Sequence, residues 1–385
     1  MSTITSFDFQ PSIRIIFGEN TIDKLGHFAK ELGGRRGLLV SDPGLVQAGH
    51  VARALEALNN ESLATFLFNE VEENPTTHHV ENGVQFVKAH QPIDLIIGLG
   101  GGSAMDCAKG INFLLTNGGK MEDYWGMGKA AKPMLPSIGI PTTAGTGSEA
   151  QSYALIVHAQ TYRKMACGDR KARFRTVILD SALLASVPVR VAAVTGIDAV
   201  SHAVESHVCT RRNAVSQMFA REAWRLLDKN FIRLQREPTN VAAQSGMLLG
   251  AHLAGAAIEN SMLGAAHASA NPLTARYKLA HGIAVGLMLP HVIRFNQQAA
   301  NQDYADLLKG VDLIERKNAS GGEVLSERIR ELKSAWGLPA RLRDCGVDES
   351  ALPELAQAAT QEWTGKFNPR PLTEQDFLQL YLAAF

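Results

Sequence analysis

The chain has 385 residues, of which 45% are hydrophobic and 34 are glycines, so it is long enough for two globular domains with substantial cores. Lysine plus arginine and aspartate plus glutamate number 38 each, and this zero formal net charge argues against nucleic acid or an anionic membrane as a partner. The four cysteines form no CxxC pair, no apolar run reaches the about 20 residues of a membrane span, and residues 1–8 lack the blocks of a signal peptide, so the sequence predicts a cytoplasmic protein.

The first half of the chain alternates short apolar strands with helical patterns. Strands separated by helical segments of about 10–15 residues are typical of βαβ units, so this half is expected to form a mainly parallel sheet covered by helices. The expected strands are Ile13–Phe17, Gly37–Val40, Ala64–Phe68, Asp94–Gly98, Pro136–Ile140 and Thr176–Leu179.

The second half has a different character, with long helical patterns rich in alanine, leucine and charged residues. The change falls near Pro188. The sequence therefore predicts an α/β domain over residues 1–185 and an all-helical domain over residues 186–385. The expected helices of the second domain include Ala214–Phe231, Val241–Ile258, Tyr304–Glu315 and Glu323–Trp336.

Two segments of the first half have the composition of nucleotide-binding loops. Gly100-Gly101-Gly102-Ser103 follows a strand and opens a helix, where glycine lets the backbone approach a ligand and free N–H groups attract a pyrophosphate. The order is not GxGxxG, so a tight turn explains this loop about equally well when it is taken alone. Asp42 follows an earlier strand and could bind ribose hydroxyls, although Asp42-Pro43-Gly44 by itself is more often a turn.

A third segment, Pro141–Glu149, is rich in hydroxyl groups and glycine. It comes directly after an expected strand, and ligands of open α/β folds collect at the carboxyl ends of the strands. Such a loop suits ribose and phosphate oxygens.

Four residues of the second half have the chemistry of a metal site. Asp198 and His202 stand four apart in a helical pattern, which places both on one helix face, and His267 and His281 follow further along the chain. One carboxylate and three imidazoles suit Fe²⁺ or Zn²⁺. Because the chain has 12 histidines, chance pairs are common, and spacing alone leaves a surface or core role open for each of them.

Taken together and in order, these segments resemble the iron-containing (group III) alcohol dehydrogenases over nearly the whole chain. The family's fold is dehydroquinate-synthase-like, with an N-terminal Rossmann-like nucleotide-binding domain, a C-terminal helical metal-binding domain and the active site in the cleft between them. The resemblance implies a homodimeric, metal-dependent oxidoreductase that transfers a hydride between NAD(H) and a small alcohol or aldehyde. The most specific matches are Gly100–Ser103 with Asp106 and Lys109, Pro141–Glu149, Gly196–Ala199 with His202 and Glu205, His281-Gly282 with Leu289-Pro290-His291, and Asn368-Pro369-Arg370.

The resemblance also implies roles for single residues. The metal, Fe²⁺ with Zn²⁺ as the alternative, would be held by Asp198, His202, His267 and His281. The NAD-binding residues would be Asp42 at the adenosine ribose, Gly101, Gly102 and Ser103 at the pyrophosphate with Asp106 in the same segment, Thr142, Thr143 and Thr146 at the nicotinamide half, and Lys164.

One position departs from the family pattern. Where the family often has a histidine four residues after its third metal ligand, this chain has Asn271. An amide can hydrogen-bond a substrate oxygen but cannot act as an acid or base near neutral pH, so Asn271 is the candidate catalytic residue while a proton relay through it is in doubt. Gln151 and Glu259 also differ from the usual pattern, which predicts a substrate preference unlike that of the best-known members.

Two other enzyme classes share the expected architecture. One is a metal- and NAD-dependent lyase resembling dehydroquinate synthase, which would need a dense basic pocket, and the basic residues between Arg163 and Arg175 leave this open. The other is a metal-independent reductase of the same superfamily, against which the complete Asp198, His202, His267 and His281 set argues. A non-enzymatic scaffold gives no reason for that set beside intact cofactor loops.

Overall fold

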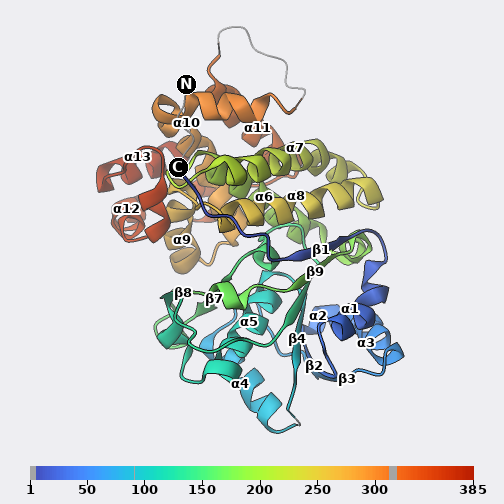
Figure 1. Ribbon diagram of the computed structural model, residues 1–385. Helices are drawn as coiled ribbons and strands as arrows, with labels where there is room; N and C mark the ends of the chain where they lie inside the picture. Colours follow the sequence, from blue (N-terminus) through green and yellow to red (C-terminus); the bar gives the residue numbers. More distant parts are fainter. Residues whose placement is uncertain (1–5, 91, 312–318) are drawn as a thin grey trace. The chain divides into compact units, whose positions relative to one another are not determined.

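The computed structural model describes residues 6–90, 92–311 and 319–385, and the contacts within it divide the chain into two compact units (Figure 1). One unit is α/β and consists of Gln10–Thr143 and Gly147–Val187. The other is helical and consists of Pro188–Phe385, the short segment Ala144–Thr146 and the N-terminal stretch that ends at Phe9. The predicted combination of a parallel α/β part with an all-helical part is confirmed. That the α/β part binds the dinucleotide and the helical part binds the metal stays a prediction.

The α/β unit is built on a six-stranded parallel sheet with the strand order β1-β9-β6-β4-β2-β3. All six predicted strands are confirmed, with ends that shift by at most two residues. Their apolar, β-branched sequences suit a sheet that is buried on both faces. The bounds are β1 Arg14–Phe17, β2 Arg36–Val40, β3 Ala64–Phe68, β4 Leu95–Gly100, β6 Ser137–Pro141 and β9 Thr176–Leu179.

Helices cover both faces of this sheet (Figure 1). Successive residues of a strand point to opposite faces, and accordingly Ile96 and Ile97 of β4 belong to two different apolar clusters. The cluster that contains Ile96 packs α4 (Thr77–Lys88) and α5 (Gly102–Asn117), and the one that contains Ile97 packs α1 (Leu25–Glu31) and α3 (His50–Asn60). Between β2 and α3 lies the short helix α2, Pro43–Gln47.

A second, three-stranded sheet was not predicted. It has the order β5-β8-β7, formed by Gly126–Met127, Lys164–Gly168 and Tyr153–Val157, and β7 and β8 pair antiparallel. Alternate residues of this hairpin are buried, including Ala154, Ile156, Met165 and Cys167. This alternation is the signal that could have found the hairpin, although two five-residue strands are stable only when packed on the rest of the core.

The helical unit contains the remaining long helices. The helices predicted at 214–231, 241–258 and 323–336 are confirmed. The one predicted at Tyr304–Glu315 is wrong in its start, because Tyr304 lies in the last turns of a long helix that ends at Leu308, and residues 312–315 lie outside the described residues. The bounds are α6 Val189–Val208, α7 Ala214–Arg236, α8 Val241–Glu259, α9 Ala265–Tyr277, α10 His281–Leu308, α11 Gly321–Ala335, α12 Leu352–Thr360 and α13 Glu374–Ala384.

Helix α8 is long and apolar enough to cross a membrane by length and composition. However, 67% of its apolar window is buried inside the protein, where it packs against α6 and α7. A helix that is hydrophobic on all sides and buried by its neighbours is typical of a protein core.

Candidate functional site

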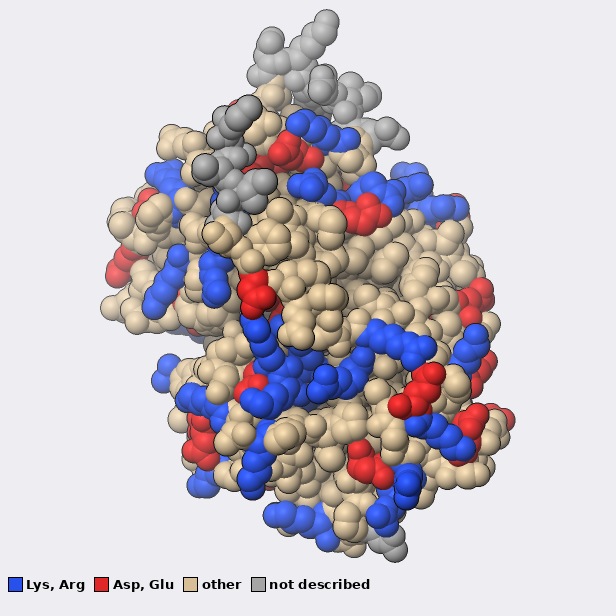
Figure 2. Space-filling model, in the orientation of Figure 1, with Lys and Arg blue, Asp and Glu red and all other residues tan. Residues whose placement is uncertain are grey.

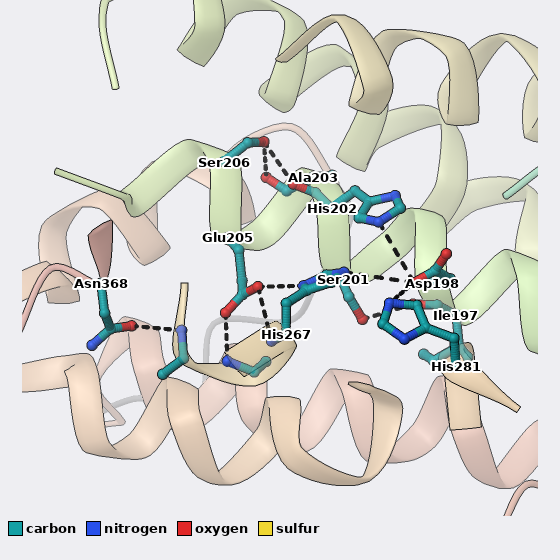
Figure 3. A network of polar contacts seen from close by, with 12 residues as sticks. Ile197, Asp198, Ser201, His202, Ala203, Glu205, Ser206, His267, His281 and Asn368 are labelled. Carbon is teal, nitrogen blue, oxygen red and sulfur yellow. Dashed lines mark hydrogen bonds and ion pairs between the residues drawn. The ribbon is translucent and has the colours of Figure 1, made fainter. Parts of the chain in front are cut away.

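Three helices bring the predicted metal ligands together (Figure 3). Asp198 and His202 lie one turn apart on α6, His267 lies in the first turn of α9, and His281 is the first residue of α10. The ligand atoms of Asp198, His267 and His281 all lie within 4.8 Å of one another. His202 joins them from the side, since its Nε2 lies 3.5 Å from Asp198 Oδ1 and its ring stacks on His267 with 4.9 Å between centroids.

The distances and burial in this cluster fit a cation. Asp198 Oδ1 lies 3.5, 3.7 and 4.0 Å from the Nε2 atoms of His202, His267 and His281, which is too far for good hydrogen bonds. Two ligands that each lie about 2.1 Å from one ion are at most about 4.2 Å apart, so all three distances are compatible with a shared ion. Within the described residues, Asp198 Oδ1 and His267 Nε2 are buried and have no hydrogen-bond partner, and an ion would satisfy both.

The protonation of the metal-free cluster follows from its charges. Burial alone would raise the pKa of Asp198, but the imidazoles of His202, His267 and His281 hold it below its usual value. Burial lowers the pKa of His202. Burial also opposes the charge on His267, yet the nearby carboxylates of Asp198 and Glu205 raise its pKa to about 9. A cation at this place would take over the charge of a proton that the two carboxylates stabilise on His267.

Glu205 also belongs to the candidate site; in the sequence it stands among the matching residues, with no role predicted for it. It lies on α6, three residues after His202, and its Oε2 is 2.5 Å from His267 Nδ1. With Nδ1–H donated to the Glu205 carboxylate, Nε2 is the ring nitrogen that faces Asp198 and would remain for a metal. The signal was the spacing of seven residues from Asp198 to Glu205, which places both on the same side of α6.

Close helix packing depends on Gly282. A Cβ atom at this position would lie 2.0 Å from the carbonyl oxygen of Val194 on α6 and 3.2 Å from the Cβ of Asp198. Only glycine therefore lets the first turn of α10 touch α6 so closely. The contact brings His281, the preceding residue, beside Asp198.

In the α/β unit, three of the predicted cofactor positions meet at one edge of the sheet. Asp42 is the N-cap of α2 and accepts the Leu45 N–H at 3.1 Å, directly after β2. The neighbouring strand β4 ends at Gly100, where a Cβ atom would lie 3.4 Å from Asp42 Oδ2. A Cβ atom at Gly101 would lie 3.5 Å from Thr143 Oγ1 in the loop after β6. Because these strands are parallel neighbours, their loops form one surface at their carboxyl ends.

Gly100 itself requires glycine. Its φ of +153° is rarely adopted by other residues, and a Cβ would lie 2.7 Å from Ala104 in the helix that follows. Helix α5 then begins at Gly102, with Gly101 as an N-cap that offers no side chain. Ser103 accepts a hydrogen bond from the Asn74 N–H at 3.3 Å. The helix N-terminus therefore has the open backbone that an anion needs.

Asp106 and Lys109 lie deeper, on the buried face of α5. The Ser148 hydroxyl donates to Asp106, and Lys109 Nζ donates to the carbonyl oxygens of Ser148 and Tyr153, both at 2.7 Å. Burial raises the pKa of Asp106, against the opposing effects of Lys109, Ser148 and Lys164. These contacts fasten the loop after β6 to α5, so Asp106 has a structural role, and its predicted role in binding the cofactor stays a prediction.

The remaining cofactor positions are more dispersed. Thr142 is buried, and its N–H donates to the Gly100 carbonyl at 3.0 Å. Thr146 belongs to the short segment that clusters with the helical unit, and Lys164 is exposed at the start of β8. The structure brings Thr142 and Thr143 to the sheet edge near Gly100 and Gly101.

Asn271 lies four residues after His267 on α9, which places both on similar faces of that helix. Its Nδ2 donates to Glu362 Oε2 at 2.6 Å, just before the short 3₁₀ helix at Trp363–Phe367. The amide is thus held by a carboxylate, and its own carbonyl oxygen still has acceptor capacity while one N–H remains for another partner.

Three of the basic residues that kept the lyase alternative open are engaged locally. Lys171 Nζ donates to the Ala130 carbonyl at 2.9 Å and lies 3.3 Å from Asp169. Arg173 bonds the Ser12 hydroxyl, and the Arg163 guanidinium stacks over Trp125. Figure 2 shows one area where Lys and Arg gather, with acidic residues interspersed over the visible face. These contacts favour a solvated, locally paired surface over a dense anion-binding pocket.

Comparison with known proteins gives a consistent result. Residues 11–181 match the family described as iron-containing alcohol dehydrogenase, and residues 192–385 match the C-terminal part of that family. The 1,3-propanediol dehydrogenase of Klebsiella pneumoniae is 32% identical over 98% of this chain and 99% of its own length, and the NAD-dependent methanol dehydrogenase of Bacillus methanolicus is 30% identical over 98% and 99%. A solved 1,3-propanediol oxidoreductase superposes with a TM-score of 0.95 at 32% identity, covering 99% of this chain and 100% of that one.

Proposed function

Because this chain belongs to the iron-containing alcohol dehydrogenase family and is therefore an oxidoreductase of small alcohols or aldehydes, we propose that Asp198, His202, His267 and His281 hold the metal of that reaction. The observation that carries the proposal is the pair of buried, unpartnered atoms Asp198 Oδ1 and His267 Nε2 among the described residues, 3.7 Å apart. A divalent ion held by these residues would supply the Lewis acid of a reaction in which NAD(H) exchanges a hydride with the substrate.

The residues of this chain have distinct tasks in the proposal. Asp198 would be the one anionic ligand, so that the site would keep a net charge of about +1 with a divalent ion and could stabilise negative charge on a substrate oxygen. Glu205 holds the His267 ring in the tautomer that leaves Nε2 free. Asn271, held by Glu362, orients a polar group of the substrate through its amide and does not move a proton.

Fe²⁺ is the proposed metal, with Zn²⁺ as the alternative, since the ligands suit both ions. The proposal also includes a homodimer in the cytoplasm, without nucleic acid or a membrane as partner. The support for a dimer is strand β1, which lies at the edge of the sheet and leaves Ile15 and Phe17 each 45% exposed. Exposed apolar side chains on an edge strand favour pairing with another chain.

NAD is the proposed coenzyme, and Asp42 is proposed to select it over NADP. Replacing Asp42 by asparagine keeps an oxygen for the Leu45 N–H but removes the charge that would repel a 2′-phosphate. We expect the ratio of kcat/KM for NAD to that for NADP to fall at least about tenfold, since juxtaposed like charges cost more than 1 kcal/mol. Steady-state kinetics with both coenzymes measure the ratio, and an unchanged ratio would remove Asp42 from the adenosine site.

The experiment that tests the function follows NADH formation or loss over a panel of small alcohols and aldehydes. It compares chelator-treated protein with the same protein reloaded with Fe²⁺ or Zn²⁺. Turnover that returns only with metal is the expected result, and the best substrate of the panel defines the preference. Turnover that ignores the metal would favour the metal-independent reductase, and consumption of a substrate with no net change in NADH would favour the lyase.

Metal binding should also stabilise the protein without any substrate. At a free metal concentration about 100 times Kd, an ion that binds only the folded chain adds about 2.7 kcal/mol to the free energy of unfolding. We therefore expect the melting temperature of the chelator-treated protein to rise when Fe²⁺ or Zn²⁺ is added. Mg²⁺, which prefers oxygen ligands, is the control and should give no comparable rise. An equal shift with all three ions would contradict a site made of imidazoles.

A further inference from the structure

The N-terminus of helix α9, which carries His267, has no cap from its own segment. The residue before the helix is Gly264, which offers no side chain, and a helix N-terminus leaves backbone N–H groups without partners inside the helix. In this structure side chains from two distant parts of the chain supply those partners (Figure 3).

Glu205, on α6, supplies one part of this cap. Its Oε1 accepts the Ala266 N–H at 2.7 Å, and its Oε2 accepts the His267 N–H at 3.4 Å as well as the ring Nδ1 at 2.5 Å. One buried carboxylate therefore holds both the backbone and the ring of His267. A shift of either group would move the other.

Asn368, near the end of the chain, supplies the second part. Its Oδ1 accepts the Ala265 N–H at 3.3 Å. The same amide forms a reciprocal pair with Asn296 on α10, with hydrogen bonds of 2.9 and 2.7 Å, and also donates to the Arg370 carbonyl at 2.6 Å. Asn368 is 3% exposed, so its orientation is set by these four contacts rather than by water.

Gly264 makes room for both side chains. A Cβ atom there would lie 3.0 Å from Glu205 Oε1 and 3.1 Å from Asn368 Oδ1. The two oxygens thus converge on the same point at the start of α9. The absence of a side chain at this position is what allows an external cap.

We propose that Glu205 and Asn368 form a shared cap, supplied by α6 and the C-terminal segment, that positions His267 as a metal ligand. Asn368 is a positioning residue in this arrangement, because its hydrogen bonds are to Asn296, Arg370 and the first backbone N–H of α9, and it acts on His267 through that helix start. The inference rests on the proposed role of His267 in holding the metal. It gives the Asn368-Pro369-Arg370 segment a task at the metal site, which lies about 100 residues earlier in the sequence.

The test measures Co²⁺ affinity by competition with a chelator, together with the visible absorption spectrum of the bound Co²⁺. We expect Asn368→Ala and Glu205→Gln each to weaken Co²⁺ binding about 10- to 100-fold, which is the usual effect of losing a contact to a ligand, and to change the spectrum. Glu205→Gln has almost unchanged volume and places an N–H group against a donor. If Asn368→Ala does not fold, Co²⁺ binding by Glu205→Gln still tests the cap.

Asn230→Ala is the matched control. Asn230 is a buried amide of the same helical unit, 5% exposed, and it donates to the Leu226 carbonyl of its own helix at 2.7 Å. This variant should lose stability and still bind Co²⁺ within about threefold of the unaltered protein, since surrounding contacts of the ligands are intact. Backbone hydrogen exchange at residues 265–267 should accelerate in Asn368→Ala and not in the control.

Two results would overturn the inference, and they can be told apart. If the unaltered protein binds Co²⁺ and both cap variants bind it with equal affinity and the same spectrum, the cap has no role in positioning His267. If the unaltered protein takes up no Co²⁺, the proposed metal site fails and the inference fails with it. The cap is supported if Asn368→Ala and Glu205→Gln bind Co²⁺ more weakly than the unaltered protein while Asn230→Ala does not.

Discussion

Replacing Asp198 by alanine is expected to abolish metal retention and to lower turnover at least about a thousandfold, or ~4 kcal/mol of barrier. The variant removes the only carboxylate among the proposed ligands and leaves three neutral imidazoles, with no negative charge to balance a buried divalent cation. Metal content after gel filtration and the rate of NADH formation measure the two effects.

Asp228→Ala is the control for this variant. The Asp228 and Asp198 side chains are both 7% exposed, and Asp228 pairs with Arg328 at 2.6 Å in the same helical unit. Loss of that ion pair should destabilise the protein without releasing the metal. Metal content and turnover of the two variants are therefore compared at a temperature at which both are folded. Retention of metal and turnover by Asp198→Ala would remove Asp198 from the ligand set.

Replacing Lys109 by methionine is expected to lower the free energy of unfolding by about 3–5 kcal/mol. Methionine fills a similar volume, but it leaves the carbonyl oxygens of Ser148 and Tyr153 without their donor and the buried Asp106 carboxylate without the cation 3.9 Å away. Urea unfolding followed by circular dichroism measures the loss.

Lys88→Met provides the comparison. Lys88 is exposed in the last turn of α4, and exchange of such a surface residue normally changes stability by no more than about 0.5 kcal/mol. If Lys109→Met lost less than about 1 kcal/mol, Lys109 would not be the residue that holds the loop after β6 on α5. The buried contacts of Asp106 and Lys109 would then need another explanation.

The periodicity of the sequence located the main sheet correctly. Each of its strands contains a short run of apolar residues, and the central strands β4 and β6 are buried throughout, so the pattern is visible without knowledge of the neighbours. The hairpin of β7 and β8 was missed because its residues are buried only alternately and it is stabilised by packing on the main core, so it lacks the continuous apolar run that marks the central strands of the main sheet. Tyr304 was placed in a separate helix because the kink at Ala300 interrupts the pattern of α10.

The candidate site was only partly visible in the same way. Asp198 and His202 could be paired from their spacing on one helix, and the resemblance added His267 and His281. The spacing could not show that Asp198 Oδ1 and His267 Nε2 are buried and unpartnered within the described part of the chain, because burial depends on how α6, α9 and α10 pack. Nor could it show that Asn271 is held by Glu362, 91 residues further along.

By itself, then, the sequence determined the class of fold, the order of the elements and the residue types of the site, since these depend on local patterns of hydrophobicity, turn residues and helical spacing. The tertiary structure alone decided which side chains act together. Glu205, His267 and Asn368 come from three separate segments, and only packing brings Glu205 and Asn368 to the same helix N-terminus. A hydrogen bond requires its two atoms to lie within about 3 Å in space, whatever their separation along the sequence, so the sequence alone cannot show which residues are paired.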